Sequence, residues 1–313
     1  MDALAVVLQQ PEQLTLSRLA LTPPTDADVV VEMEWSGIST GTERLLYTGR
    51  MPSFPGMGYP LVPGYESVGR VVQAAPGGPR AVGDRVFVPG ARCYGDVRGL
   101  FGGAASRVVV PADKVVPVGD RLGEEGVLLA LAATAYHVTA GDPAIQPDLI
   151  VGHGVLGRLI ARTALAVGGP APTVWELDGE RAKGGDGYRV VHPDDDDRRD
   201  YRHVCDVSGD SKILDTLIAR LAPGGEIVLA GFYTDPLAFT FPPAFMREAR
   251  MRVAAEWRPA DLAGVQSLVA ADRLSLDGLI THRADAPDAE GAYRTAFGDP
   301  SCLKMILDWR DCQ

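Results

Sequence analysis

The chain has 313 residues, more than one hydrophobic core usually organises, so we expect two domains. With 46% hydrophobic and 23% charged residues it is typical of globular proteins, and no apolar run approaches the roughly 20 residues that a membrane span requires. The formal net charge of -11 disfavours binding to nucleic acid and to anionic lipid.

The first part of the chain, to about residue 118, has short apolar runs separated by Gly and Pro. This spacing predicts an all-β barrel, with strands at 3–8, 29–33, 67–73, 84–89, 106–110 and 114–118. From about residue 123 helical and strand patterns alternate, which predicts a doubly wound parallel sheet. The expected helices cover 128–140, 157–166 and 211–221, and the expected strands cover 149–151, 173–177, 204–207 and 226–230.

The part after about residue 257 is too short to form a domain of its own. It contains helical patterns at 261–271 and 289–295 and strand patterns at 279–281 and 304–307. We expect this tail to return to the β region. The prediction is an α/β protein with a barrel domain of residues 1–122 and 258–313 and a Rossmann domain of residues 123–257.

A glycine motif links the predicted strand 149–151 to the next helix. Gly152, Gly154 and Gly157 form a G-x-G-x-x-G pattern. The first glycine permits the tight turn, the second lets the backbone approach a pyrophosphate, and the third lets the helix pack on the strand. The motif predicts a dinucleotide-binding loop, which also includes the intervening residues His153, Val155 and Leu156.

An acidic residue, Glu176, follows the next predicted strand, where a carboxylate accepts hydrogen bonds from the adenosine ribose. Asp178 is the alternative acid. A carboxylate there repels a 2′-phosphate, and no Arg or Lys occurs at the strand end before Arg181, so the sequence favours NAD over NADP. Gly231, at the end of strand 226–230, is expected at the sheet edge that faces the nicotinamide.

The remaining acids and cysteines give no metal motif. Cys93, Cys205, Cys302 and Cys312 form neither a disulfide framework nor a C-x-x-C pair, which favours reduced thiols in a cytoplasmic protein. The run of aspartates at 194–197 is interpreted as a solvated loop, because four successive side chains do not converge on one ion.

Two segments, 37–43 (GISTGTE) and 63–69 (PGYESVG), resemble the medium-chain dehydrogenase/reductase superfamily, and the resemblance extends over almost the whole chain. It implies a GroES-like β-barrel catalytic domain beside the Rossmann domain. Zinc-binding members have a Cys near Ser39 or Thr40, a His at the place of Tyr65 and a Cys near Ala130. Without these ligands zinc is not held, so the resemblance implies a zinc-free oxidoreductase.

Without zinc, a side chain has to take the alcohol proton as the hydride leaves. The family positions suggest Ser39, Thr42, Tyr65 and Glu66, while His137 is the best group by chemistry because imidazole titrates near neutral pH. Each has a structural alternative: Tyr65 as a filler of the lost ligand's volume, Ser39 and Thr42 bonded within their own turn, and His137 as a satisfied core residue.

A closer resemblance, carried by residues 35–52 and 60–66, is to a branch of the superfamily that acts on tetrapyrroles. It implies NAD-dependent oxidation of a 1-hydroxyethyl substituent on a chlorin or bacteriochlorin ring to acetyl, as in bacteriochlorophyll biosynthesis. Such a substrate needs an apolar wall and a cationic rim. The candidates are Phe54, Met57 and Tyr59 for the wall and Arg44, Arg50, Arg92 and Arg98 for the rim.

Other functions stay open. Within enzymes, the alternatives are a zinc-free quinone or enoyl reductase and a polyol dehydrogenase using NAD(P)H. Outside enzymes, the alternative is an NAD-binding protein without catalytic activity. The family resemblance also suggests a homodimer that joins two nucleotide sheets through the strand at about 250–255.

Overall fold

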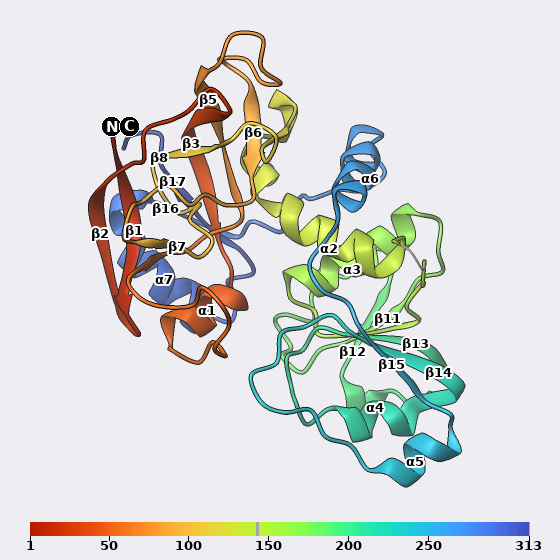
Figure 1. Cartoon of the computed structure of the whole chain (residues 1–313). Coiled ribbons are helices and arrows are strands. Elements are labelled where there is room, and N and C mark those ends of the chain that lie inside the picture. Colours follow the sequence, from red (N-terminus) through yellow and green to blue (C-terminus); the bar gives the residue numbers. More distant parts are fainter. Residues whose placement is uncertain (142–143, 313) are drawn as a thin grey trace. The chain divides into compact units, whose positions relative to one another are not determined.

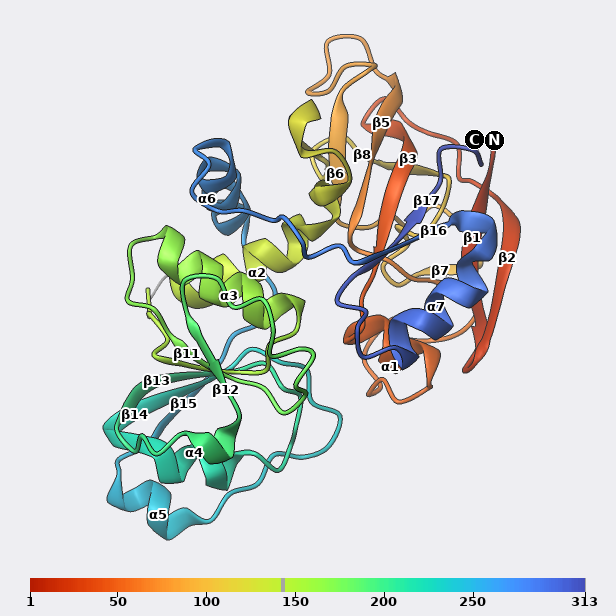
Figure 2. The same ribbon diagram turned by 180° about the vertical axis from the view of Figure 1, so that it is seen from behind.

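The computed structural model describes residues 1–141 and 144–312, and this part of the chain forms two compact units. The first unit comprises Met1–Ala130 and Asp277–Gln313, and the second comprises Leu131–Leu276. Figures 1 and 2 show the helices and strands of each unit. No helix in the described residues is long and apolar enough to span a bilayer.

The first unit is built on two β-sheets. A four-stranded sheet has the order β2-β1-β4-β7, with strands Gln13–Ala20, Asp2–Gln10, Leu61–Val62 and Arg98–Gly99. The larger sheet has the order β16-β17-β3-β5-β6-β9, and β8 also pairs with β3. Its strands are β3 Asp28–Ile38, β5 Ser67–Ala74, β6 Arg85–Val88, β8 Arg107–Pro111, β9 Val116–Pro117, β16 His282–Asp285 and β17 Met305–Asp308.

The C-terminal tail completes this first unit. Strand β17 pairs antiparallel with β3, with Met305 opposite Ile38, so the tail returns to the β region as expected. Helix α7 (Ala289–Gly298) buries Ala289, Ala292, Tyr293 and Ala296 in the same core. The short helix α1 (Thr42–Tyr47) follows β3, and the 3-10 segments η1 (Asp120–Leu128) and η3 (Ala286–Asp288) complete the unit.

The second unit contains a parallel six-stranded sheet, as the alternating pattern predicts. Its order is β12-β11-β10-β13-β14-β15, with strands Arg189–Val191, Thr173–Trp175, Leu149–Val151, Tyr201–Asp206, Leu221–Leu229 and Arg250–Val253. Helices α2 (Leu129–Thr139) and α3 (Val155–Ala166) lie on one face, and α4 (Leu214–Arg220) and α5 (Phe241–Met246) lie on the other (Figure 1). The remaining elements are η2 (Pro193–Asp195) and α6 (Pro259–Ala270).

The boundaries between the units differ from the sequence expectation. Helix α6 belongs to the second unit, because its Asp261 pairs with His137 on α2 and its Gly264 lies against the ring of Tyr136. The expected strand at 279–281 begins three residues later, as β16. Strand β2, helices α1 and α5, and strand β12 were not among the expected elements.

One acidic loop also departs from its interpretation. Asp196 is buried rather than solvated, because its carboxylate accepts hydrogen bonds from the Trp175 indole and the Tyr201 hydroxyl, both at 2.6 Å. It is a structural acid of the second unit. Among the described residues, no group of three His, Cys, Asp or Glu side chains is arranged to hold a metal.

Candidate active site

Two hydroxyl groups meet where β3 ends in the first unit. Ser39, one residue beyond β3, has its Oγ 2.8 Å from the Oη of Tyr65. Tyr65 follows Gly64, whose φ of +100° and close approach to the backbone of Ala104 admit only glycine. The chain turns there and brings Tyr65 back to the end of β3.

The surroundings of Tyr65 keep its phenol protonated. Burial raises the pKa of Tyr65 and the negative charge of Glu66 adds to the increase, while hydrogen bonds with Ser39 and Thr42 oppose it. At neutral pH the group is therefore a neutral hydroxyl, able both to donate and to accept a hydrogen bond. The ring meets Phe101 edge to face, with the two ring centroids 5.5 Å apart.

Glu66 forms a buried ion pair with a lysine that sequence analysis did not select. The Nζ of Lys304 lies 2.5 Å from Glu66 Oε2 and donates a second hydrogen bond to the carbonyl oxygen of Ile38 at 3.2 Å. Both side chains are almost completely buried. Glu66 Oε1 has no hydrogen-bond partner in the described residues. The pair thus ties the residue after Tyr65 to the end of β3.

A second carboxyl group, Glu43, supports Ser39. Glu43 lies in the first turn of α1, where Oε1 accepts the Ser39 N–H at 3.3 Å and Oε2 accepts the Tyr293 hydroxyl at 2.6 Å. Burial raises the pKa of Glu43 to about 7, against the lowering effect of the Tyr293 hydrogen bond and with a further increase from the charge of Glu66. The carboxyl group therefore changes protonation near neutral pH.

The donor set does not fit a catalytic zinc ion. Zinc sites in proteins use thiolate, imidazole or carboxylate ligands. Ser39 and Tyr65 present neutral hydroxyls, and Ala130 presents no donor. The thiol of Cys93 is buried in the core of the first unit, and burial raises its pKa, so it offers no thiolate ligand.

The glycine turn of the second unit has the geometry of a phosphate cradle. Gly152 has a φ of +102°, and a Cβ on Gly157 would lie 1.9 Å from the carbonyl oxygen of Gly152. A Cβ on Gly154 would meet nothing within 4 Å, and α3 begins there without a side-chain cap. Backbone N–H groups at such a helix start suit a pyrophosphate, so these residues fit a dinucleotide.

The two candidate acids have different roles. Glu176 follows β11 directly, and its Oε2 accepts the His153 N–H of the glycine turn at 2.9 Å. Its Oε1 accepts the N–H groups of Leu177 and Asp178. Asp178 instead closes its own turn by accepting the N–H groups of residues 180 and 181, and these bonds lower its pKa. Glu176 is thus the acid bonded to the glycine turn.

The other predicted cofactor residues lie around this turn. Val155 begins α3 and is buried, Leu156 is half-buried, and His153 is completely buried. Gly231 follows β14, and a Cβ on it would lie 3.3 Å from the backbone of Gly209.

His137, the candidate base chosen by chemistry, belongs to the second unit. Its Nδ1 lies 2.9 Å from Asp261 Oδ2, and both side chains are largely buried. Asp261 also accepts the Arg258 N–H that starts α6. The imidazole therefore joins α2 to α6, which matches the structural alternative expected for a core histidine.

Three site residues were not selected from sequence: Lys304, Glu43 and Tyr293. One signal was available for Lys304, since it is a single cation beside the apolar run of the last strand. For Glu43 the signal was its place at the end of the 37–43 segment that carries the family resemblance. Tyr293 had no signal, because a tyrosine in a helical pattern is common on protein surfaces.

A GroES-like barrel unit with a hydroxyl-lined site and a parallel nucleotide-binding sheet define an alcohol dehydrogenase-type oxidoreductase. Residues 25–120 match the alcohol dehydrogenase GroES-like domain family. The chain is 57% identical to the 2-desacetyl-2-hydroxyethyl bacteriochlorophyllide A dehydrogenase of Cereibacter sphaeroides over 99% of both chains. It is 55% identical to the protein of the same name from Rhodobacter capsulatus over the full length of both.

Solved structures agree in fold. The 2R,3R-butanediol dehydrogenase of Bacillus subtilis aligns with a TM-score of 0.84 at 21% identity, covering 98% of this chain and 99% of that chain. An alcohol dehydrogenase of Thermotoga maritima aligns with a TM-score of 0.81 at 19% identity, with the same coverage. The expected fold class is confirmed. The chain belongs to the family of the 2-desacetyl-2-hydroxyethyl bacteriochlorophyllide A dehydrogenases, within the medium-chain dehydrogenase/reductase superfamily.

Proposed function

We propose that this oxidoreductase oxidises the 3-(1-hydroxyethyl) group of a bacteriochlorophyllide or chlorophyllide to 3-acetyl, with NAD as cofactor and without zinc. The observation that carries the substrate is the full-length identity of 57% to a dehydrogenase named for this hydroxyethyl group. We place the reaction in the cytoplasm, consistent with four cysteines that are all free thiols.

The zinc-free mechanism rests on the Ser39–Tyr65 hydroxyl pair. When bound, a nicotinamide dinucleotide supplies the hydride acceptor. Tyr65 Oη accepts the proton of the substrate hydroxyl while its own proton moves to Ser39 Oγ, 2.8 Å away, and Ser39 releases its own hydroxyl proton to water. Because the raised pKa of Tyr65 disfavours phenolate, a concerted transfer is the route that avoids this anion.

The supporting residues hold this pair in place. Glu43 accepts the Ser39 N–H, and the Lys304–Glu66 ion pair fixes the residue next to Tyr65. Thr42 adds a hydrogen bond to the phenol. We assign proton transfer to Tyr65 and Ser39, and positioning to Thr42, Glu43 and Glu66.

An aromatic side chain beside Tyr65 offers a surface for a flat macrocycle. Phe101 is 36% exposed although its ring contacts Tyr65, so one part of the ring remains accessible. The Tyr59 hydroxyl bonds to the Leu46 carbonyl, and Met57 and Tyr59 are half-buried against the same apolar cluster, so their contacts are within the unit. We therefore assign the apolar wall to Phe101 with Phe54, which is 39% exposed.

The preference for NAD rests on Glu176. Its carboxylate is held beside the glycine turn by three backbone N–H groups. A fixed negative charge at this place accepts ribose hydroxyls and repels a 2′-phosphate.

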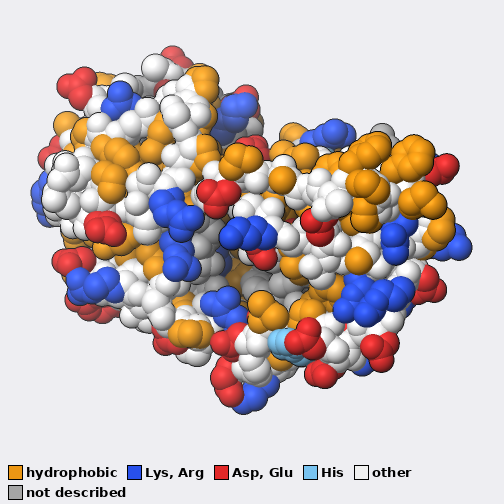
Figure 3. Space-filling model, turned by 90° about the horizontal axis from the view of Figure 1, so that it is seen from below, with side chains coloured by type: hydrophobic (Ala, Val, Ile, Leu, Met, Phe, Trp, Pro, Cys, Tyr) orange, Lys and Arg blue, Asp and Glu red, His pale blue; other side chains and the backbone are white. Residues whose placement is uncertain are grey.

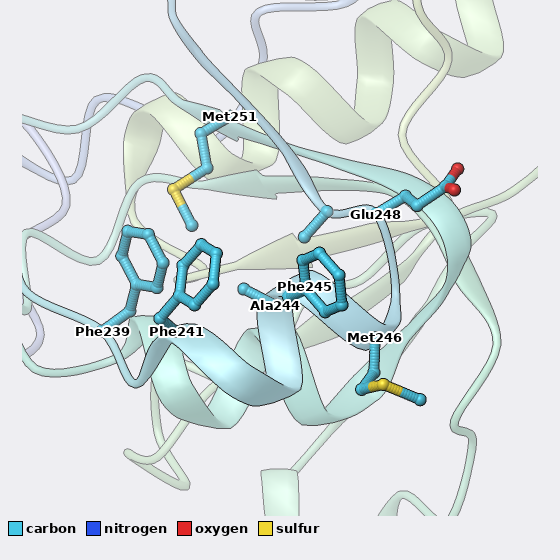
Figure 4. A pocket seen from close by; sticks show the side chains of 8 residues that line it. Phe239, Phe241, Ala244, Phe245, Met246, Glu248 and Met251 are labelled. Carbon is cyan, nitrogen blue, oxygen red and sulfur yellow. The ribbon is translucent and has the colours of Figure 1, made fainter.

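We also propose a homodimer through the outer edge of the second unit's sheet. Strand β15 ends the strand order, so one side of it is unpaired within the unit. Hydrophobic side chains gather at the right-hand end of the face in Figure 3. A groove of about 540 Å³ lies beside β15, and Figure 4 shows Phe239, Phe241 and Met251 close together there. Phe241, Phe245 and Val253 are each at least 65% exposed, which favours a second copy as the occupant.

Sedimentation of the wild type and of Val253→Lys tests the proposed homodimer. A wild-type dimer that becomes a monomer in Val253→Lys supports it, and a monomeric wild type contradicts it.

The experiment that tests the function is a reaction of the purified protein with 3-(1-hydroxyethyl)bacteriochlorophyllide and NAD or NADP. We expect the acetyl product and one NADH per turnover, with NAD preferred. Activity only on quinones, enones or polyols would contradict the substrate, and cofactor binding without turnover on any of them would favour a non-catalytic NAD-binding protein. Metal analysis and a chelator control test the zinc-free mechanism, which predicts full activity after chelation.

A further inference from the structure

Two buried polar side chains lie inside the glycine turn. His153, between the first two glycines, is completely buried, and Arg158, directly after the third glycine, is 6% exposed. Burial of a guanidinium is costly unless its donors are satisfied. The bonds that satisfy it therefore indicate what this cation does.

Arg158 binds backbone carbonyl groups only. Its Nε donates to the carbonyl oxygen of His153 at 3.1 Å. Its two terminal nitrogens donate to the carbonyl oxygens of the loop after Glu176, which are those of Arg181 at 2.8 Å, Lys183 at 2.7 Å and Gly184 at 3.3 Å. No carboxylate of the described residues lies within ion-pair distance of it. One side chain therefore joins the glycine turn to the loop of residues 181–184.

The ring of His153 strengthens the same connection. Its Nδ1 lies 2.6 Å from the Arg181 carbonyl oxygen, which can only accept, so Nδ1 carries the hydrogen. Burial lowers the pKa of His153 to about 4, so the ring is neutral near pH 7 and Nε2 accepts from the Tyr188 hydroxyl at 2.8 Å. His153 is thus held at its ring, at its carbonyl oxygen by Arg158 and at its N–H by Glu176.

We infer that Arg158 is a positioning residue for the adenosine half of the dinucleotide: through His153 and the carbonyl groups of 181–184 it fixes the glycine turn and the Glu176 loop before the cofactor binds. The inference rests on the proposed dinucleotide binding. Glycine-rich turns lose much conformational freedom when they are ordered. A turn that is already fixed in the free protein loses little further conformational entropy when the cofactor binds, so the affinity is higher.

The test is a binding measurement on the full chain. Kd values for NADH and for ADP-ribose are measured by calorimetry for the wild type, Arg158→Met and Arg158→Lys, with Arg202→Met as a control at an exposed arginine of the same unit. Amide hydrogen exchange of residues 152–158 is followed in the free proteins. We expect Arg158→Met to raise both Kd values about tenfold and to speed exchange in the turn, while Arg202→Met changes the Kd less than about twofold.

The lysine variant separates position from charge. Lys keeps the cation but has no planar fork with which to reach four carbonyl groups, so we expect it to restore less than half of the lost binding free energy. Wild-type affinity in Arg158→Lys would overturn the inference. So would unchanged Kd values in Arg158→Met, and a lower melting temperature in that case would show a purely structural residue.

A milder variant keeps the inference falsifiable if Arg158→Met does not fold. Tyr188→Phe removes one hydroxyl from the His153 ring, and we expect about a threefold higher Kd for NADH with faster exchange at residue 153. Unchanged values would contradict the inference. A wild type that binds neither dinucleotide would overturn the cofactor assignment together with it, whereas a wild type that binds NADH without oxidising the tetrapyrrole affects the proposed substrate alone.

Discussion

The ammonium group of Lys304 lies 2.5 Å from the Glu66 carboxylate, and the two side chains are 2% and 0% exposed. An ion pair so completely buried contributes little net stability, but the removal of one partner leaves a charge without compensation. Glu66 directly follows Tyr65, and Lys304 also binds the carbonyl oxygen of Ile38, the residue before Ser39. The ion pair therefore links the stability of the barrel unit to the geometry of the proposed site.

Lys304→Met is expected to lower the free energy of unfolding by about 3 to 5 kcal/mol, because Glu66 stays buried without its partner. Adding Glu66→Gln is expected to restore most of the loss. Urea unfolding of the single and double variants measures this, with Lys212→Met as an exposed control. Equal stability of Lys304→Met and the control would show that Glu66 does not require the ion pair.

Tyr65→Phe is expected to lower kcat by about 100-fold or more while the melting temperature changes little, since only the hydroxyl that accepts the proton is lost. Ser39→Ala is expected to have a smaller effect, because solvent can replace the second hydroxyl. Steady-state kinetics with the tetrapyrrole substrate measures both. Tyr47→Phe, a change of the same kind on α1, is the control, and a Tyr65→Phe enzyme with wild-type kcat would remove Tyr65 from the mechanism.

Glu43→Gln is expected to change the pH dependence of stability. The pKa of Glu43 is raised from 4.5 to about 7, so the folded state holds this proton more tightly than the unfolded chain does. The contribution of this group to the free energy of unfolding is fully present below pH 4.5 and is lost as the pH rises through about 7. Glu43→Gln lacks this loss, so its free energy of unfolding relative to the wild type should rise between pH 4.5 and about 7, by on the order of 3 kcal/mol at most. Denaturant unfolding at a series of pH values checks the difference, and a constant difference would contradict it.

Glu176→Gln is expected to weaken the preference for NADH over NADPH. The variant keeps one acceptor oxygen but removes the charge that opposes a 2′-phosphate. The ratio of the two Kd values should fall about tenfold, mainly through tighter NADPH binding. Asp178→Asn serves as the matched control, because Asp178 bonds within its own turn. A ratio that changes only in the control would transfer the selectivity to Asp178.

The sequence by itself determined the features that are local along the chain. The glycine turn could be predicted because Gly152, Gly154 and Gly157 lie within six residues, between a strand and a helix that each have their own pattern. Most strands of both units, though not β2 or β12, followed from patterns of the same kind, and the residue types at Ser39 and Tyr65 are read directly from the chain. Turn geometry and donor chemistry depend on residue type and short spacing, both of which a sequence displays directly.

Only the tertiary structure decided which distant residues meet. Lys304 and Glu66 are 238 positions apart, and Tyr293 and Glu43 are 250 apart. Asp196 is buried because Trp175 and Tyr201 bond to it, and α6 joins the second unit because Asp261 bonds to His137. Polar side chains such as these lie on the surface unless a partner compensates the cost of burial. Their partners come from other elements, so the fold decides their roles.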